Sequence, residues 1–125
     1  MRSRPRDMQA HGLHFDLSPA DTAVVLHCHG TVDLSTRGAF RDWIDRALKQ
    51  RGDRRLILDL SGVEFIDSAG LQALMQALLE CDGKGTAWTL RPSKQVEGLL
   101  LLAGMGRLGS DQTGGWLGGG GYGDL

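Results

Sequence analysis

The sequence has few cysteines and no long apolar segment, and each absence excludes a class of protein. Its 125 residues include only two cysteines, Cys28 and Cys81, which are too few for the disulfide framework of a small secreted domain. Both lie in segments with an apolar pattern, so we expect reduced, buried thiols. The longest apolar run, "GLLLLAG", is far too short to cross a bilayer, which takes about 20 residues.

An excess of charge of one sign is also missing. The formal net charge is -1, which argues against a general nucleic-acid binder. The first residues, "MRSRPRDMQAHG", are charged and contain no apolar segment of the kind found in secretory signals. We therefore expect a cytoplasmic protein that binds no nucleic acid, does not insert into a membrane and uses no cofactor.

Composition divides the chain into three parts. A hydrophobic fraction of 41% can form the core of one domain, which we place at residues 11–108. Residues 1–10 are predicted to be a disordered arm. The glycine-rich residues 109–125 are predicted to be a flexible tail. When free, the protein is expected to be a monomer.

Apolar periodicity predicts an α/β fold. The segment "TAVVLHCHG" alternates, with Val24, Leu26 and Cys28 on one face of a strand. "RRLILDLSGVEF" is a nearly continuous apolar run, as expected of a central strand, and "LHFDL" and "TAWTLRP" predict two further strands. Helical stripes follow in "DLSTRGAFRDWIDRALKQRG", "LQALMQALLE" and "SKQVEGLLLLAGMG". The resulting alternation favours parallel pairing around helical crossovers.

Side chains that cap helices stand before each helical stripe. Asp33 or Ser35 can cap the first helix and Ser93 the last. In "EFIDSAGLQALMQALLE", residues 64–80, both Asp67 and Ser68 are present although one cap, worth about 1 kcal/mol, is enough. Gly70 is predicted to leave the first turn bare, so that another protein can approach its backbone.

A phosphoryl group on Ser68 would carry about -1.5 to -2 charges and three acceptor oxygens. The start of a helix tolerates such a group because its amides and dipole favour an anion. An interface centred on Ser68 would not tolerate it. Ser68 is thus either a helix cap or a regulatory phosphorylation site, and the two roles can coexist.

Catalysis by Ser68 is weakly supported. The segment "IDSAG" has isoleucine where the G-x-S-x-G nucleophile motif has its first glycine. Asp67 would oppose an oxyanion, and no histidine follows His29 to act as base.

A metal site is also weakly supported. His27 and His29 share one strand face, but a third ligand would have to come from His11 or His14. The sequence therefore predicts neither an enzyme nor a metal protein.

The sequence resembles the STAS domain family, which includes bacterial anti-sigma factor antagonists. The resemblance runs from about Leu13 to Leu108. Three segments carry it: "HGTVDLSTRGAFRDWIDRAL", "RLILDLSGVEFIDSAGLQALMQALLE" and "RPSKQVEGLLLLAGMGRL". It implies a small mixed β-sheet with helices packed mainly on one face.

The resemblance also implies a function in transcription regulation by partner switching. The serine that matches Ser68 is phosphorylated in family members by an anti-sigma factor that is also a serine protein kinase. The unmodified protein binds that partner, and the phosphorylated protein releases it. Asp33, Asp67 and Gly70 are implied to shape the docking surface, beside which Leu71 begins the helix.

Two departures from the family pattern leave an alternative open. Thr31 stands where an acidic residue usually precedes the first helix, and the chain becomes glycine-rich where a last strand and helix usually follow. The same fold also serves as a subunit of lipid-transport ABC complexes, where it binds the ATPase without phosphorylation. A serine in the motif favours the regulatory switch.

Overall fold

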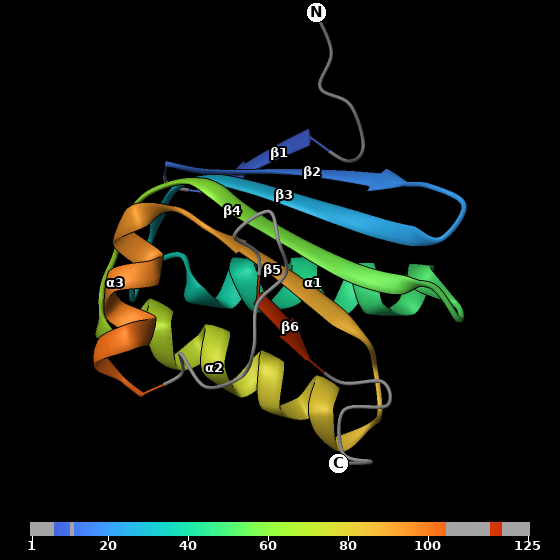
Figure 1. The fold of residues 1–125 in the computed structure, drawn as a ribbon. Helices are drawn as coiled ribbons and strands as arrows, with labels where there is room; N and C mark the ends of the chain where they lie inside the picture. The colour runs from blue at the N-terminus through green and yellow to red at the C-terminus, as the bar shows by residue number, and fades with distance from the viewer. Residues whose placement is uncertain (1–6, 11, 105–115, 119–125) are drawn as a thin grey trace, which may run out of the picture.

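The computed structural model describes residues 7–10, 12–104 and 116–118, and these form one β-sheet with helices packed against it (Figure 1). In chain order the elements are β1 (Asp7–Ala10), β2 (Leu13–Pro19), β3 (Ala23–Val32), α1 (Arg37–Arg51), β4 (Arg55–Ile66), α2 (Ser68–Gly83), β5 (Trp88–Pro92), α3 (Lys94–Leu102) and β6 (Trp116–Gly118). None of the helices in the described residues is long and apolar enough to span a membrane.

The strands lie in the sheet in the same order as in the chain, β1-β2-β3-β4-β5-β6. β3 pairs parallel with β4 and β4 parallel with β5, whereas the outer pairs are antiparallel. Both parallel steps advance in the same direction across the sheet, and right-handed crossovers then put both connecting helices on the same face. Figure 1 shows α1 and α2 running beneath the sheet, with α3 beside its left-hand end. The predicted mixed sheet with helices mainly on one face is confirmed.

Alternate strand positions supply the core between the sheet and the helices. In β4, Leu56, Leu58 and Leu60 are completely buried, whereas Ile57 and Asp59 between them are partly exposed. The predicted helical stripes also point inward. The buried helix residues are Phe40, Trp43, Ile44 and Ala47 in α1, Gly70, Ala73, Leu74, Ala77, Leu78 and Cys81 in α2, and Val96 and Leu100 in α3.

Both cysteines are free and buried, as predicted. Burial raises the pKa of the Cys28 thiol, and it raises the pKa of the Cys81 thiol to about 11. Both thiols are therefore protonated near pH 7, and neither has the thiolate character of a reactive cysteine.

The two edges of the sheet correct the expectation for the ends of the chain. Residues 7–10, predicted to be disordered, pair antiparallel with β2, and residues 116–118 of the predicted flexible tail pair antiparallel with β5. The physical reason is the row of unpaired backbone groups that a strand presents at a sheet edge. The rest of the predicted arm and tail, residues 1–6, 109–115 and 119–125, lies outside the described residues.

Candidate functional site

Ser68 is the first residue of α2, and its side chain is exposed. The preceding residue, Asp67, has an extended backbone (φ -103°, ψ -174°), and its Oδ1 accepts a hydrogen bond of 2.9 Å from the Gly70 amide. Asp67 is therefore the N-cap of α2. Among the described residues the Ser68 hydroxyl makes no hydrogen bond, so the exposed hydroxyl has no capping role.

The backbone of this turn leaves room for an anion. The first amides of a helix have no acceptor within the helix, and only that of Gly70 is taken by the Asp67 carboxylate. The amides of Ser68 and Ala69 stay at the positive end of the helix dipole, directly beside the Ser68 side chain. The arrangement is chemically suited to a phosphoryl group on Ser68.

Gly70 has a different role from the predicted one. It is buried, and a Cβ added to it would collide with the Val32 carbonyl oxygen and lie 2.8 Å from Val32 Cγ1. The amide of Asp67 also donates a hydrogen bond of 3.2 Å to the Val32 carbonyl. The backbone that approaches Gly70 is therefore the end of β3 in the same chain, so the absent side chain of Gly70 makes room for Val32; access of another protein to the outer side of the turn stays a prediction.

Asp33 follows Val32 and orders the loop between β3 and α1. Its Oδ1 accepts hydrogen bonds from the Ser35 amide at 2.9 Å, the Ser35 hydroxyl at 2.7 Å and the Thr36 amide at 3.1 Å. The Ser35 hydroxyl, with these amides, holds the pKa of the Asp33 carboxyl below its ordinary value. α1 begins at Arg37, and Thr36 at its N-cap position makes no side-chain cap hydrogen bond. The capping oxygens come from Asp33, whose carboxylate accepts from the Ser35 and Thr36 amides and whose carbonyl accepts from the Arg37 amide at 2.9 Å. Of the two residues predicted to cap this helix, Asp33 is the one that does so.

The contact at Val32 brings the Asp33 loop to the turn that holds Ser68. Asp33 and Asp67 are both partly exposed there. Leu71, in contrast, is half-buried and packs against the core. Of the three residues predicted to shape a docking surface, Asp33 and Asp67 are partly exposed and Gly70 is buried; Leu71, predicted to lie beside that surface, is half-buried.

Two exposed apolar side chains at the same end of the sheet were missed by the sequence analysis. Phe65 is 54% exposed and pairs in register with Thr31, and Leu34 is 65% exposed in the loop that follows. The sequence analysis assigned Phe65 to an apolar strand. In the structure, the regular alternation of buried and exposed residues along β4 ends before Phe65. Leu34, a large apolar residue within the polar segment "DLST", was the clearer signal.

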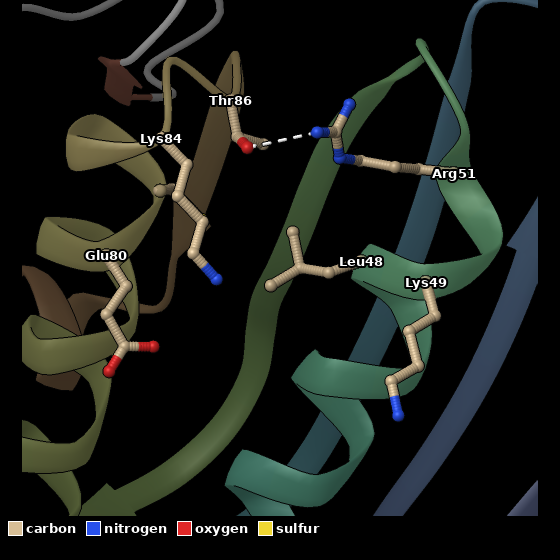
Figure 2. A pocket seen from close by; sticks show the side chains of 7 residues that line it. Leu48, Lys49, Arg51, Glu80, Lys84 and Thr86 are labelled. Carbon is tan, nitrogen blue, oxygen red and sulfur yellow. Dashed lines mark hydrogen bonds between the residues drawn. The ribbon is translucent and has the colours of Figure 1, made fainter.

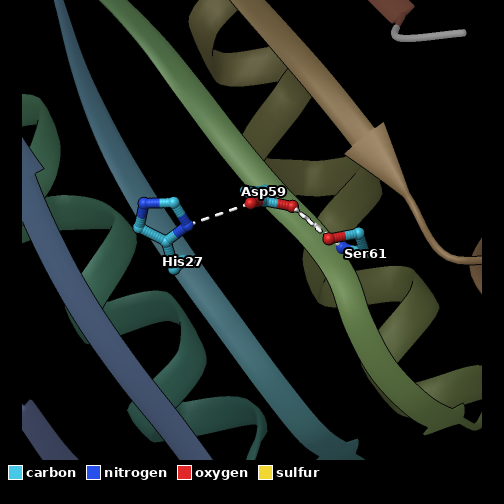
Figure 3. Close-up of polar contacts among 3 residues, drawn as sticks. All are labelled: His27, Asp59 and Ser61. Carbon is cyan, nitrogen blue, oxygen red and sulfur yellow. Dashed lines mark hydrogen bonds and ion pairs between the residues drawn. The ribbon is translucent and has the colours of Figure 1, made fainter.

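The open face of the sheet carries a polar chain of three residues (Figure 3). Asp59 accepts a hydrogen bond of 2.6 Å from the Ser61 hydroxyl through Oδ1 and lies 2.9 Å from His27 Nδ1 through Oδ2. A catalytic triad needs the imidazole between serine and carboxylate, whereas here the carboxylate lies in the middle. Among the described residues no histidine hydrogen-bonds to Ser68 either. The geometry therefore gives no support to serine catalysis.

The remaining histidines do not assemble a metal site in the part of the chain that the structure describes. His14 stacks on His29, with ring centroids 4.9 Å apart and planes inclined by 5°. No group of three or more histidine, cysteine or carboxylate side chains that could hold a metal ion occurs among the described residues. His11, the other possible ligand, lies outside them.

Comparison with known proteins identifies the family. The STAS domain family model matches residues 14–109, most of the chain. The chain belongs to the STAS domain family. A Thermotoga maritima protein named as an anti-sigma factor antagonist is 26% identical over 95 residues, which cover 75% of this chain and 84% of the relative.

Solved STAS structures agree with this assignment. An anti-sigma factor antagonist from Mycobacterium paratuberculosis is 25% identical, with a TM-score of 0.65 over 83% of this chain and 84% of that one. SpoIIAA in its unphosphorylated form, 21% identical, shares the fold with a TM-score of 0.56 over 74% of this chain and 82% of its own. SpoIIAA thus shows the shared fold, and the two relatives named as anti-sigma factor antagonists, at 26% and 25% identity, support a regulatory role for this STAS domain.

Proposed function

We propose that this STAS domain is a phosphorylation-controlled anti-sigma factor antagonist of the cytoplasm. With Ser68 unmodified, it binds an anti-sigma factor that is also a serine protein kinase; with Ser68 phosphorylated, it releases that partner. The protein itself transfers no group and is not an enzyme. The observation that carries the proposal is the exposed Ser68 hydroxyl, which makes no hydrogen bond to any described residue and stands at the start of a helix that Asp67 already caps.

Phosphorylation at this position is compatible with the fold. The Ser68 side chain is exposed and contributes no cap, so a larger group displaces no internal contact. The amides of Ser68 and Ala69, which have no acceptor among the described residues, and the positive end of the α2 dipole favour the added negative charge. We expect the phosphorylated protein to keep its structure.

The surroundings of Ser68 explain why the same group would weaken binding. Leu34 and Phe65 are exposed apolar side chains at this end of the molecule, as expected in the core of an interface. Asp33 and Asp67 already supply negative charge beside Ser68. A doubly charged phosphoryl group buried there would lose its hydration and repel both carboxylates.

The solved relatives support the phosphorylation proposal. SpoIIAA has been solved in an unphosphorylated and in a phosphorylated form. In the alternative function, the chain would be a subunit of a lipid-transport ABC complex that binds the ATPase, and Ser68 would stay unmodified. The relatives named as antagonists favour the regulatory function.

The test is phosphorylation by the natural kinase. The pure full-length protein is incubated with ATP and a lysate of its source organism, recovered, and weighed by intact-mass spectrometry. We expect the mass of one phosphoryl group to be added to the wild type and to the control Ser35→Ala, an exposed serine of the neighbouring loop. Ser68→Ala should gain nothing.

The second part of this test identifies the lysate proteins that bind to the pure protein. Unmodified protein should retain a protein with an ATP-binding kinase domain, and Ser68→Asp should not. Addition of the phosphoryl group to Ser68→Ala, or an unmodified wild type bound to an ABC ATPase, would contradict the proposal.

A further inference from the structure

A hollow of about 260 Å³ lies between the C-terminal ends of α1 and α2 (Figure 2). It is at the opposite end of α2 from Ser68, and the 16 residues of that helix span about 24 Å. Figure 2 shows Arg51 and Lys84 reaching into the space from the two sides, with Leu48 between them. The hollow is therefore separate from the phosphorylation site.

Positive charge dominates the lining of this hollow. Lys49, Arg51 and Lys84 come from two segments of the chain, and within the described residues neither lysine makes an ion pair. The carboxylate at the rim belongs to Glu80, whose Oε1 is 2.7 Å from Nη2 of Arg41 and is neutralised by that contact. Three cationic side chains thus border one small space, against one lining carboxylate that is already paired with Arg41 and the nearby Asp82 carboxylate, which accepts a hydrogen bond from Trp88.

Two hydrogen bonds within the protein hold the Arg51 side chain in place, but they leave other N–H donors of its guanidinium group unused. Its Nη2 donates to the Thr86 hydroxyl at 3.0 Å, and its Nη1 donates to the Arg54 carbonyl at 3.0 Å. Its Nε is buried and has no acceptor. A guanidinium has five N–H donors, and a buried donor without an acceptor costs free energy. Each Nη group also has a second N–H beyond these two bonds, and a ligand acceptor at the hollow would use those donors.

Helix dipoles explain only part of this arrangement. Lys49 and Arg51 lie in the last turn of α1, where cations interact favourably with the dipole, and Lys84 is the C-cap residue of α2. The dipole effect requires neither a hollow between the helices nor a fixed guanidinium with an unused donor. Those two features indicate a ligand.

The floor of the hollow is apolar. Leu48 is half-buried, and Cys81 is buried with a thiol whose pKa burial raises to about 11, so it adds no charge near pH 7. At about 30 Å³ per water molecule, the volume corresponds to about nine waters. The space suits a ligand of about ten non-hydrogen atoms with one anionic and one apolar end.

We propose that this hollow binds a small organic anion. Its phosphate or carboxylate group lies between Arg51 and Lys84, within the field of Lys49, and its apolar part packs on Leu48 and Cys81. The guanidinium already held by Thr86 and the Arg54 carbonyl presents its remaining donors to that group, as planar guanidinium groups do for carboxylates and phosphates.

The probe that tests this proposal is phenyl phosphate, which has about the required size. The ¹⁵N-labelled full-length protein is titrated with it, ionic strength being held constant with sodium chloride to control for screening. We expect saturable, millimolar binding with shifts at the amides of Leu48, Arg51 and Thr86. Benzoate then shows whether a carboxylate suffices, and inorganic phosphate, which lacks the apolar part, should bind more weakly.

Three variants make the result decisive. Lys84→Gln removes an exposed charge that makes no ion pair with any described residue and should weaken phenyl phosphate binding about tenfold, as expected on losing one close charge. Lys94→Gln, an equally exposed lysine at the start of α3, should leave the affinity unchanged. Ser68→Asp should also leave it unchanged, which separates this site from the proposed phosphorylation switch.

Other outcomes would overturn the proposal. Neutral benzyl alcohol binding as tightly as phenyl phosphate would show that the charges do not take part. Equal affinity of wild type and Lys84→Gln would show the same, as would shifts spread evenly over the protein. Absence of saturation by both phenyl phosphate and benzoate would show that the hollow is not an anion site.

Discussion

The first turn of α2 has an inner side that packs against the protein and an outer side that faces solvent, and the two differ in burial and in contacts. On the inner side, Gly70 is pressed against the backbone of Val32, and Leu74 one turn later is completely buried. On the outer side, Ser68 is exposed and its hydroxyl makes no hydrogen bond among the described residues, and Gln72 one turn later is exposed. Asp67 stands at the boundary and caps the helix.

The contrast shows how a residue of a folded protein can be chemically modified without loss of stability. Every contact that fixes the turn belongs to the inner side or to Asp67, so the outer side is free to change chemically. A residue needed for the cap could not be modified without loss of stability. Four substitutions test this separation, in order of their expected effect on the free energy of unfolding.

The largest effect is expected from Leu74→Ala on the inner side. Removing a completely buried leucine side chain costs about 2–5 kcal/mol, because a cavity replaces core contacts. Denaturant unfolding followed by circular dichroism measures the loss. Gln72→Ala, on the outer side of the same helix, is the control and should change stability by less than about 0.5 kcal/mol. Similar losses in both variants would abolish the contrast.

Gly70→Ala should destabilise by about 1–3 kcal/mol, because its methyl group would force the Val32 backbone away. The control is Gly38→Ala in α1, where an added Cβ meets nothing within 4 Å. That variant should gain about 0.5–1 kcal/mol from the better helix propensity of alanine. Opposite signs in thermal unfolding would confirm the close approach, and two stabilised proteins would disprove it.

Asp67→Ala should cost about 1 kcal/mol through loss of the N-cap hydrogen bond to Gly70. Ser68→Ala, at the neighbouring position, should stay within about 0.5 kcal/mol of the wild type. Chemical denaturation of the two variants under identical conditions decides which residue caps α2. A larger loss in Ser68→Ala would reverse our assignment.

The smallest effect on stability is expected from Ser68→Asp, less than about 0.5 kcal/mol, because the added charge is exposed at the favourable end of the helix dipole. Its binding to the proposed partner should nevertheless be strongly reduced, as calorimetric titration would show. A stable variant that binds normally would leave the outer side without a regulatory role.

Much of this contrast could be predicted from the sequence. Periodicity predicted the inward face of α2, including Leu74, and the order of strands and helices. It could not decide between Asp67 and Ser68 as the cap, because both side chains accept amide hydrogen bonds at that position.

Features that depend on tertiary contacts were beyond the sequence. The role of Gly70 depends on Val32, which is distant in the chain, so the sequence did not reveal that the glycine makes room for β3. The pairing of Asp7–Ala10 and Trp116–Gly118 depends on free sheet edges rather than on an apolar pattern. The hollow at Arg51 and Lys84 likewise forms only when the ends of α1 and α2 meet.

The order of the strands has a consequence for folding. Because each strand pairs only with the strand before and the strand after it in the chain, no pairing skips a strand. The antiparallel pairs β1-β2 and β2-β3 close short loops at a low entropic cost, whereas the parallel pairs β3-β4 and β4-β5 each close a longer helical crossover. The turn that carries Ser68 requires contacts from only the end of β3, the end of β4 and the start of α2. Among the described residues, the hydrogen bonds of this turn involve none from β5, α3 or β6.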